Sequence, residues 1–261
     1  LLQQNEALRQ RSGQALELVR IVDLLPQESA ERHGLPRELY AGAAPELTLE
    51  EAEAATQEIL RDPSVDVIVE AIGGSGEAAL GIARAVLEHG KHLVTANKAL
   101  LAMRGEELVE LANKQGRGLG FEAAVCGAIP IIKALNECLT GDEIVSVSGI
   151  MNGTSNYILS KMASEGQSFE AALKDAQDKG YAEADPTLDI DGGDAGHKLT
   201  ILVRLVFGVD LAFSDIPRQG IDTITEGEVA FAHEMDGVIK LICYAERVGD
   251  TVHAGVVPMI V

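Results

Sequence analysis

The stretch from Val65 to Gln115 constrains the fold most, because two short apolar runs alternate there with two segments of helical period. Val65–Glu70 and His92–Thr95 are typical of buried strands, and the helical patterns 75–90 and 100–115 follow them. Strands that alternate with helices across short links are typical of a parallel sheet covered by helices. The sequence therefore predicts an α/β fold with a doubly wound parallel sheet.

The segments before this stretch extend the same pattern. We expect a helix up to about Gln10, a strand at Leu16–Leu24 and a helix around Glu28–His33. A further helix is predicted at Thr48–Leu60, where Thr-Leu-Glu-Glu forms a plausible capping box.

After Gly116 the strict alternation of strands and helices ends. The expected strands are Leu119–Val125 and Ile144–Ile150, and Ile239–Ala245 and His253–Val261 are expected to form an antiparallel pair. The expected helices are one from about Ile131, Asn156–Ser164 and Phe169–Gln177. We therefore place a first domain at residues 1–118 and a second, α+β domain at residues 119–261.

Charge and composition narrow the function classes. The formal net charge is −20, from 41 acidic and 21 basic residues, which would repel nucleic acids and anionic membrane surfaces. No apolar run is long enough to span a bilayer, no signal-peptide pattern is present, and the three cysteines form no CxxC pair. A sparse, odd cysteine count fits a reducing compartment, so we expect a cytoplasmic protein with no nucleic-acid or membrane partner.

Two candidate ligand contacts follow the strands of the first domain. Ligands of doubly wound sheets bind beyond the carboxyl ends of the strands. Gly73 and Gly74, where backbone could approach a cofactor closely, and the pair Asn97-Lys98 lie at such ends. An ordinary tight turn and a solvated lysine are the alternative interpretation.

A Gly-x-Gly-x-x-Gly turn is absent from the sequence, and we expect that turn and its strand upstream of residue 1. Asp23, near the end of the expected second strand, is placed to bind an adenosine ribose 2′-hydroxyl. Because no Arg or Lys follows it in 24–28, the sequence favours NAD over NADP.

The stretch Gly180–Lys198 carries the strongest candidate for catalysis. A helix is predicted to start near Asp194, which we expect as its N-cap, with Lys198 one turn later on the same face. A lysine ammonium held between a helix N-terminus and nearby carboxylates suits acid–base chemistry. The alternative is a solvated i, i+4 pair on a capped helix.

Two other segments could also contact a ligand. The segment Asn152–Ser155 could bind a carboxylate at a helix N-terminus, or Thr154 could simply cap the helix. The turn Cys126–Pro130 could expose carbonyl oxygens to a hard cation, or could be a plain turn. The histidines show no metal-ligand spacing, and His197 is expected on a helix surface.

Four motifs, in order and spacing, resemble the homoserine dehydrogenase family. They are Val94–Lys98, Phe121–Ile132, Gly149–Leu159 and Gly180–Lys198. The resemblance covers most of the chain from about Val65 to Gly208, and the last motif is the most specific.

The resemblance implies a Rossmann domain, a catalytic and dimerisation domain with a mixed sheet, and a homodimer. It implies NAD(P)H-dependent interconversion of L-aspartate 4-semialdehyde and L-homoserine, in threonine and methionine biosynthesis. By position, it implies Lys198 as proton donor and Lys98 as a lysine facing cofactor and substrate. It also implies Glu183, Asp194, Asp189 and Thr154 as substrate contacts, Gly180 as a cofactor contact, and Glu122, Val125, Gly127 and Ile129 as a sodium site built largely from carbonyl oxygens.

Several alternatives remain open at this point. Another amino-acid dehydrogenase of the same build would share the cofactor domain, and an aspartate kinase–dehydrogenase fusion would share the motifs. The family's glycine- and proline-rich segment is also expected beyond residue 261, so the sequence taken literally as a whole protein could be a non-catalytic sensor or dimer partner.

Overall fold

The computed structural model describes residues 5–261, so the first residues of the expected N-terminal helix lie outside the described part. Backbone contacts divide the chain into two compact units. One comprises the residues up to Ile68 together with Ala85–His92, and the other comprises Val69–Arg84 and Leu93–Val261. The domain boundary expected at residue 118 stays a prediction.

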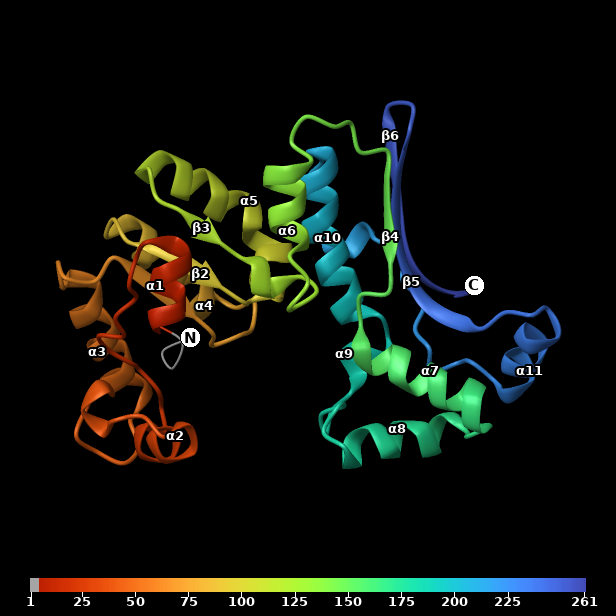
Figure 1. Ribbon diagram of the computed structural model, residues 1–261, viewed down its shortest axis with the longest axis horizontal. Coiled ribbons are helices and arrows are strands. Elements are labelled where there is room, and N and C mark those ends of the chain that lie inside the picture. The colour runs from red at the N-terminus through yellow and green to blue at the C-terminus, as the bar shows by residue number, and fades with distance from the viewer. Residues whose placement is uncertain (1–4) are drawn as a thin grey trace. The chain divides into compact units, whose positions relative to one another are not determined.

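The described part of the first unit includes the α-helices α1 (Asn5–Ser12), α2 (Pro26–His33) and α3 (Leu49–Arg61) (Figure 1). Helix α2 starts at a proline, whose missing N–H costs nothing at a helix start, and ends at Gly34 in the left-handed conformation. The expected capping box of α3 is present, since Thr48 accepts from the Glu51 N–H and Glu51 accepts from the Thr48 N–H.

The strand expected at Leu16–Leu24 is wrong. Only Ile21 pairs in this segment, in an isolated parallel bridge with Tyr40, and the side chains of Leu16, Val19 and Leu24 are exposed. Alternating apolar residues favour a strand only where a neighbouring strand supplies hydrogen bonds along its whole length, and here the neighbour meets it at one residue.

A three-stranded sheet has the order β1-β2-β3, with β1 at Val67–Glu70, β2 at His92–Thr95 and β3 at Leu119–Gly120. Strands β2 and β3 are parallel, with Leu93 opposite Leu119. Helices α4 (Glu77–Glu88) and α5 (Lys98–Gln115) follow the first two strands, which confirms the expected strand–helix alternation. The third strand is shorter than expected, because the backbone turns into a 3₁₀ helix at Glu122–Ala124.

The second unit contains an antiparallel sheet of β4 (Ser146–Gly149), β5 (Ile239–Val248) and β6 (Thr251–Ile260). The expected pairing of the last two strands is confirmed, with Cys243 opposite Val256. An isolated parallel bridge joins Arg218 to Val256 of β6.

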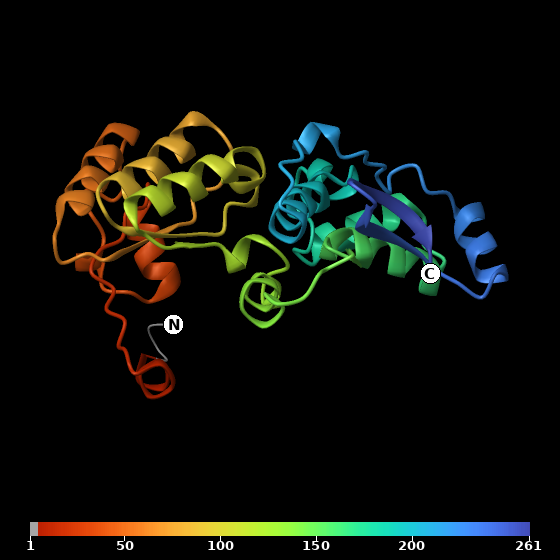
Figure 2. The same cartoon turned by 90° about the horizontal axis from the view of Figure 1, so that it is seen from above.

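Two helices pack against this sheet, α7 (Gly153–Glu165) on β5 and α10 (Gly193–Phe207) on both β5 and β6 (Figure 1). Figure 2 shows the blue β5–β6 hairpin beside the green and teal helices of this unit. Helix α10 carries the apolar stripe that its sequence indicates, and Leu199, Leu202 and Val203 are almost fully buried in the core.

The remaining elements of this unit are short or peripheral. Helix α6 (Ile131–Lys133) runs into a π-helical turn at Ala134–Cys138, and α8 (Phe169–Asp178) follows α7. Helices α9 (Thr187–Ile190) and α11 (Glu226–Glu234) were not expected from the sequence. Among the described residues, no helix combines the length and the apolar character that a bilayer crossing requires.

Candidate active site

The helix that carries Lys198 begins differently from the expectation. Its N-cap is Gly192, with a left-handed φ of 81°, and Asp194 lies inside the first turn. Asp191 takes the role expected of Asp194, since its carboxylate accepts from the Gly193 N–H at 2.7 Å. The prediction of Asp194 as N-cap is therefore wrong, and its carboxylate is free for other partners.

Asp194 lies between two lysines. Its Oδ2 accepts from Lys198 Nζ at 2.7 Å, and its Oδ1 forms an ion pair with Lys98 Nζ at 3.0 Å. Lys198 also donates to the Met151 carbonyl at 2.7 Å. The Lys198 side chain is 16% exposed and that of Asp194 only 9%, so this is not the solvated surface pair of the alternative interpretation.

The environment keeps Asp194 ionised. Burial by itself raises the pKa of this carboxyl, because desolvation disfavours the charged form. The charge and hydrogen bond of Lys198, the Asn152 donor and the charge of Lys98 outweigh burial, and the pKa lies below its ordinary value. The carboxylate is thus a fixed negative charge between two ammonium groups.

Asn152, which the sequence indicated only as one of several donors, connects the parts of this site. Its Nδ2 donates to Asp189 Oδ1 at 2.7 Å and to Asp194 Oδ2 at 2.9 Å. Its Oδ1 accepts from the Ser155 N–H, so Asn152 is the N-cap of α7, and the proposed capping by Thr154 is wrong. A side-chain amide fits here because it can accept from the helix and donate to two carboxylates at once.

Thr154 contacts the turn that follows α8 instead. Its hydroxyl donates to the Tyr181 carbonyl at 2.8 Å. This turn contains Gly180, with a left-handed φ of 72°, and the exposed residue Glu183. Thr154 thereby ties the turn to the start of α7, and Gly180 and Glu183 are both exposed.

The glycine turn after β1 is open on its outer side. Gly73 and Gly74 have φ values of 84° and 80°, and a Cβ at either would meet no heavy atom within 4 Å. The Gly74 carbonyl accepts from Asn97 Nδ2 at 2.6 Å. Asn97 is also the N-cap of α5, so Lys98 is the first residue of that helix.

The loop expected to hold sodium is strained but has no carboxylate cluster. Cys126 and Ala128 have positive φ values of 49° and 69°, which non-glycine residues rarely adopt. The Glu122 carboxylate accepts from the N–H groups of Ile132 and Lys133 at 2.9 Å, so it serves the start of α6. Within the described range, no group of three or more His, Cys, Asp or Glu side chains is placed to hold a metal ion.

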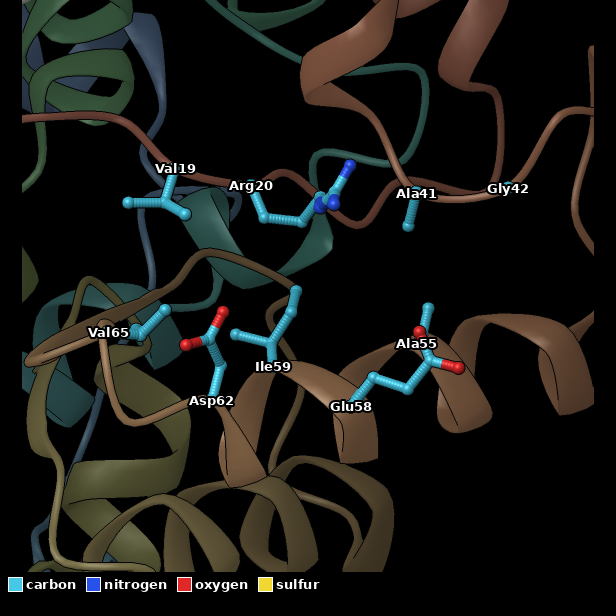
Figure 3. A pocket seen from close by; sticks show the side chains of 9 residues that line it. All are labelled: Val19, Arg20, Ala41, Gly42, Ala55, Glu58, Ile59, Asp62 and Val65. Carbon is cyan, nitrogen blue, oxygen red and sulfur yellow. The ribbon is translucent and has the colours of Figure 1, made fainter.

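Asp23 lies in the first unit, where its Oδ1 accepts from the Leu25 N–H at 2.9 Å. A cavity of about 280 Å³ lies in the same unit (Figure 3), and none of the site residues indicated by the sequence lines it. Helix α3 and its C-cap line one side of this cavity, and the segments around Arg20 and Ala41 line the other.

His197 is buried, contrary to the helix-surface position expected for it. Its side chain is stacked on Phe213, with ring centroids 4.2 Å apart, and its Nδ1 has no hydrogen-bond partner. Burial lowers the pKa of His197, and the charge of Asp194 opposes this effect only in part. The imidazole is therefore neutral and packs against Phe213, next to Lys198 in the sequence.

The fold and the site define an α/β protein with one parallel and one antiparallel sheet, and with a lysine–aspartate–lysine cluster in its second unit. A family model described as "Homoserine dehydrogenase, NAD binding domain" matches residues 4–122, and one described as "Homoserine dehydrogenase" matches residues 130–261. The chain belongs to the homoserine dehydrogenase family.

Individual relatives agree with the family models. The chain is 44% identical to a homoserine dehydrogenase of Neisseria gonorrhoeae over 87% of its length, and 40% identical to one of Pseudomonas aeruginosa over 93%. These matches cover 54% and 52% of the two relatives, so the chain spans about half of their length. A crystal structure of a homoserine dehydrogenase from Thiobacillus denitrificans superposes with a TM-score of 0.86, at 41% identity, over 99% of this chain and 57% of that one.

Proposed function

We propose that this chain supplies the cofactor-binding and proton-transfer parts of an enzyme that interconverts L-aspartate 4-semialdehyde and L-homoserine. The observation that carries the proposal is the pair of lysines, 198 and 98, on the single buried carboxylate of Asp194. Family membership supports the same reaction, since the relatives with matching sequences are homoserine dehydrogenases.

The residues present fit a nicotinamide cofactor. The open outer side of the Gly73–Gly74 turn leaves room for a flat ring to approach the backbone closely. When bound, the nicotinamide supplies or accepts the hydride, which no side chain can do.

Lys198 is the proton carrier in this proposal. Reduction of an aldehyde leaves an oxygen that must gain a proton, and the Lys198 ammonium can donate one. Met151 and Asp194 hold that ammonium in place by two hydrogen bonds of 2.7 Å. In the oxidation direction the neutral amine would remove the proton again.

Lys98 and the acidic residues would bind the substrate. The Lys98 side chain, 39% exposed, can stabilise the developing oxygen anion next to Lys198. Glu183 and Asp189 would pair with the substrate ammonium, with Asp194 and Thr154 completing the contact. This charge-assisted recognition would select amino acids over plain aldehydes.

Three further assignments belong to the same proposal. Gly180 would contact the cofactor, and Asp23 would bind the ribose 2′-hydroxyl and favour NAD. A sodium ion would be held by carbonyl oxygens around Val125, Gly127 and Ile129, where the left-handed residues Cys126 and Ala128 turn the backbone, with Glu122 completing the site.

We also propose a cytoplasmic homodimer with domains at residues 1–118 and 119–261.

Steady-state oxidation of L-homoserine by the purified full-length protein tests the reaction, with NAD and NADP compared side by side. A substrate panel of other amino alcohols separates this activity from that of a different amino-acid dehydrogenase. Absence of turnover with every amino alcohol would favour the sensor or dimer-partner interpretation. Replacing sodium with potassium at constant ionic strength tests the cation site, and light scattering tests the dimer.

A further inference from the structure

A buried carboxylate supports the glycine turn after β1. Glu70, only 3% exposed, accepts from the Ile72 N–H at 2.7 Å and from the Gly73 N–H at 3.2 Å. Its other oxygen accepts from the Thr95 hydroxyl at 2.5 Å. A buried carboxylate is costly unless donors satisfy it, and these three donors all come from the turn or from the end of the neighbouring strand.

Asn97 continues this network into helix α5. Its Nδ2 donates to the Gly74 carbonyl at 2.6 Å, while its Oδ1 caps the helix by accepting from the Leu100 N–H at 3.0 Å. Its own N–H donates to the Thr95 hydroxyl at 2.9 Å. One buried amide therefore fixes both the glycine turn and the first turn of the helix that begins at Lys98.

The network ends at the lysine pair. Lys98 directly follows Asn97 in sequence and forms an ion pair with Asp194, which also binds Lys198. A shift of the glycine turn would therefore be transmitted to the start of α5, and a shift of α5 would move the Lys98 ammonium. Neither Glu70 nor Asn97 contacts these ammonium groups, so any effect on them is indirect.

We propose that Glu70 and Asn97 are positioning residues. They hold the Gly73–Gly74 turn and Lys98 in a fixed position relative to each other. This inference rests on the proposed function, in which the turn receives the cofactor and the lysines handle the proton. A displacement of about 1 Å at a reacting centre can lower the rate on the order of 100-fold. The network would thus set cofactor affinity and turnover together.

Two substitutions at Asn97 separate positioning from helix capping. In the wild type the Asn97 amide donates to the Gly74 carbonyl. Asn97→Asp keeps an acceptor for the Leu100 N–H but replaces that donor with an oxygen. Asn97→Ser also keeps a cap but is too short to reach Gly74, and it introduces no charge. Both variants therefore break the connection to the turn and spare the cap.

The matched control is Thr225→Ala at the start of helix α11. Thr225 caps that helix through the Glu228 N–H, far along the chain from the turn and the lysines. This variant loses a cap and no contact to the site, so its melting temperature should fall by about 4 °C or less while its kinetic constants stay at the wild-type values.

The measurements are the Kd of the reduced cofactor by fluorescence titration, kcat and KM in both directions, and the melting temperature. For Asn97→Asp and Asn97→Ser we expect kcat/KM for the cofactor to fall about 10- to 100-fold. The melting temperature of Asn97→Ser should stay close to the wild-type value because the cap is kept, whereas the buried carboxylate of Asn97→Asp, facing the Gly74 carbonyl, should lower it. Glu70→Gln should weaken cofactor binding in the same direction, since an amide has one acceptor oxygen where the carboxylate serves three donors.

Wild-type kinetics and wild-type cofactor Kd in both Asn97 variants would overturn the inference. So would a loss of activity that merely follows a loss of melting temperature, as a structural role predicts. If Asn97→Asp does not fold, Asn97→Ser and Glu70→Gln give the decision. Failure of the wild-type protein to oxidise homoserine would refute the proposed function, and the cofactor Kd of the variants would still test the positioning role.

Discussion

Lys98 and Asp194 form an ion pair of 3.0 Å, although one begins helix α5 and the other lies in the first turn of helix α10. The two helices pack against each other within the same unit. Lys198 reaches the second oxygen of the same carboxylate, so two ammonium groups meet at one point. Lys198 has the more fixed position, because the Met151 carbonyl also binds it and its side chain is less exposed than that of Lys98.

Removing the Lys198 ammonium should stop proton transfer and leave cofactor binding intact. For Lys198→Ala we expect kcat to fall by about 10²- to 10⁴-fold, the range of general acid–base catalysis. Steady-state kinetics and cofactor fluorescence titration measure the two effects. Lys174→Ala is the control, because Lys174 forms an exposed i, i+4 pair with Asp178 in the same unit. Equal losses of turnover and cofactor affinity would show that Lys198 is structural.

Asp194 should stabilise the folded protein at neutral pH and lose this effect at acid pH. Its folded-state pKa lies below the ordinary value of 3.8, so the ionised form is favoured by folding. This stabilisation is complete above that value and is lost as the pH falls through the folded-state pKa. We expect Asp194→Asn to be less stable at neutral pH and to lose less stability between about pH 4 and pH 2. Urea unfolding over this range measures both slopes, and parallel slopes would contradict the assignment.

Asn152→Asp should place three carboxylates together without removing the helix cap. The amide that donates to Asp189 and Asp194 becomes an acceptor, while the Ser155 N–H keeps its partner. We expect a loss of about 1–3 kcal/mol in the free energy of unfolding at neutral pH, partly recovered at low pH. Ser168→Asp adds the same charge at the N-cap of α8 and should be nearly neutral. Equal effects in the two variants would argue against a role for Asn152 in the site.

The glycine at position 220 should not tolerate a side chain. A Cβ there would lie 2.3 Å from the Ile190 carbonyl oxygen and 2.8 Å from the Asp191 Cα, and backbone cannot move aside as a flexible side chain can. We expect Gly220→Ala to cost about 1–3 kcal/mol, measured by urea unfolding. Gly81→Ala, in helix α4 with open space around the added carbon, should instead stabilise by about 0.5–1 kcal/mol. A neutral Gly220→Ala would mean that the loop before α10 is free to shift.

The thiols should react in the order of their exposure. Burial raises the pKa of Cys243 to about 12 and also raises that of Cys126, whereas Cys138 is exposed. Because the thiolate is the reactive form, we expect iodoacetamide to modify Cys138 first and Cys243 only after unfolding. Peptide mapping by mass spectrometry gives the order. Early modification of Cys243 in the native protein would show that β5 opens.

Much of the fold could be predicted from local signals. The capping box at Thr48 and Glu51, the helical stripe of α10 and the final hairpin are encoded within a few residues each, so their patterns suffice. The strand at 16–24 could not be judged in this way, because a strand depends on a partner elsewhere in the chain. Helix α11 was missed although Thr225 and Glu228 form a capping box, a signal that the sequence does contain.

The sequence by itself determined the α/β fold, the main helices and strands, and the two lysines and the aspartate at the centre of the site. Only the tertiary structure decided how these groups meet: that Asp191 rather than Asp194 serves the start of α10, that Asn152 joins two carboxylates, and that Glu70 and Asn97 hold the glycine turn. Helix and hairpin patterns act between neighbours in the chain. Hydrogen bonds between buried polar groups form between residues far apart in sequence, and their partners are fixed only when the elements pack.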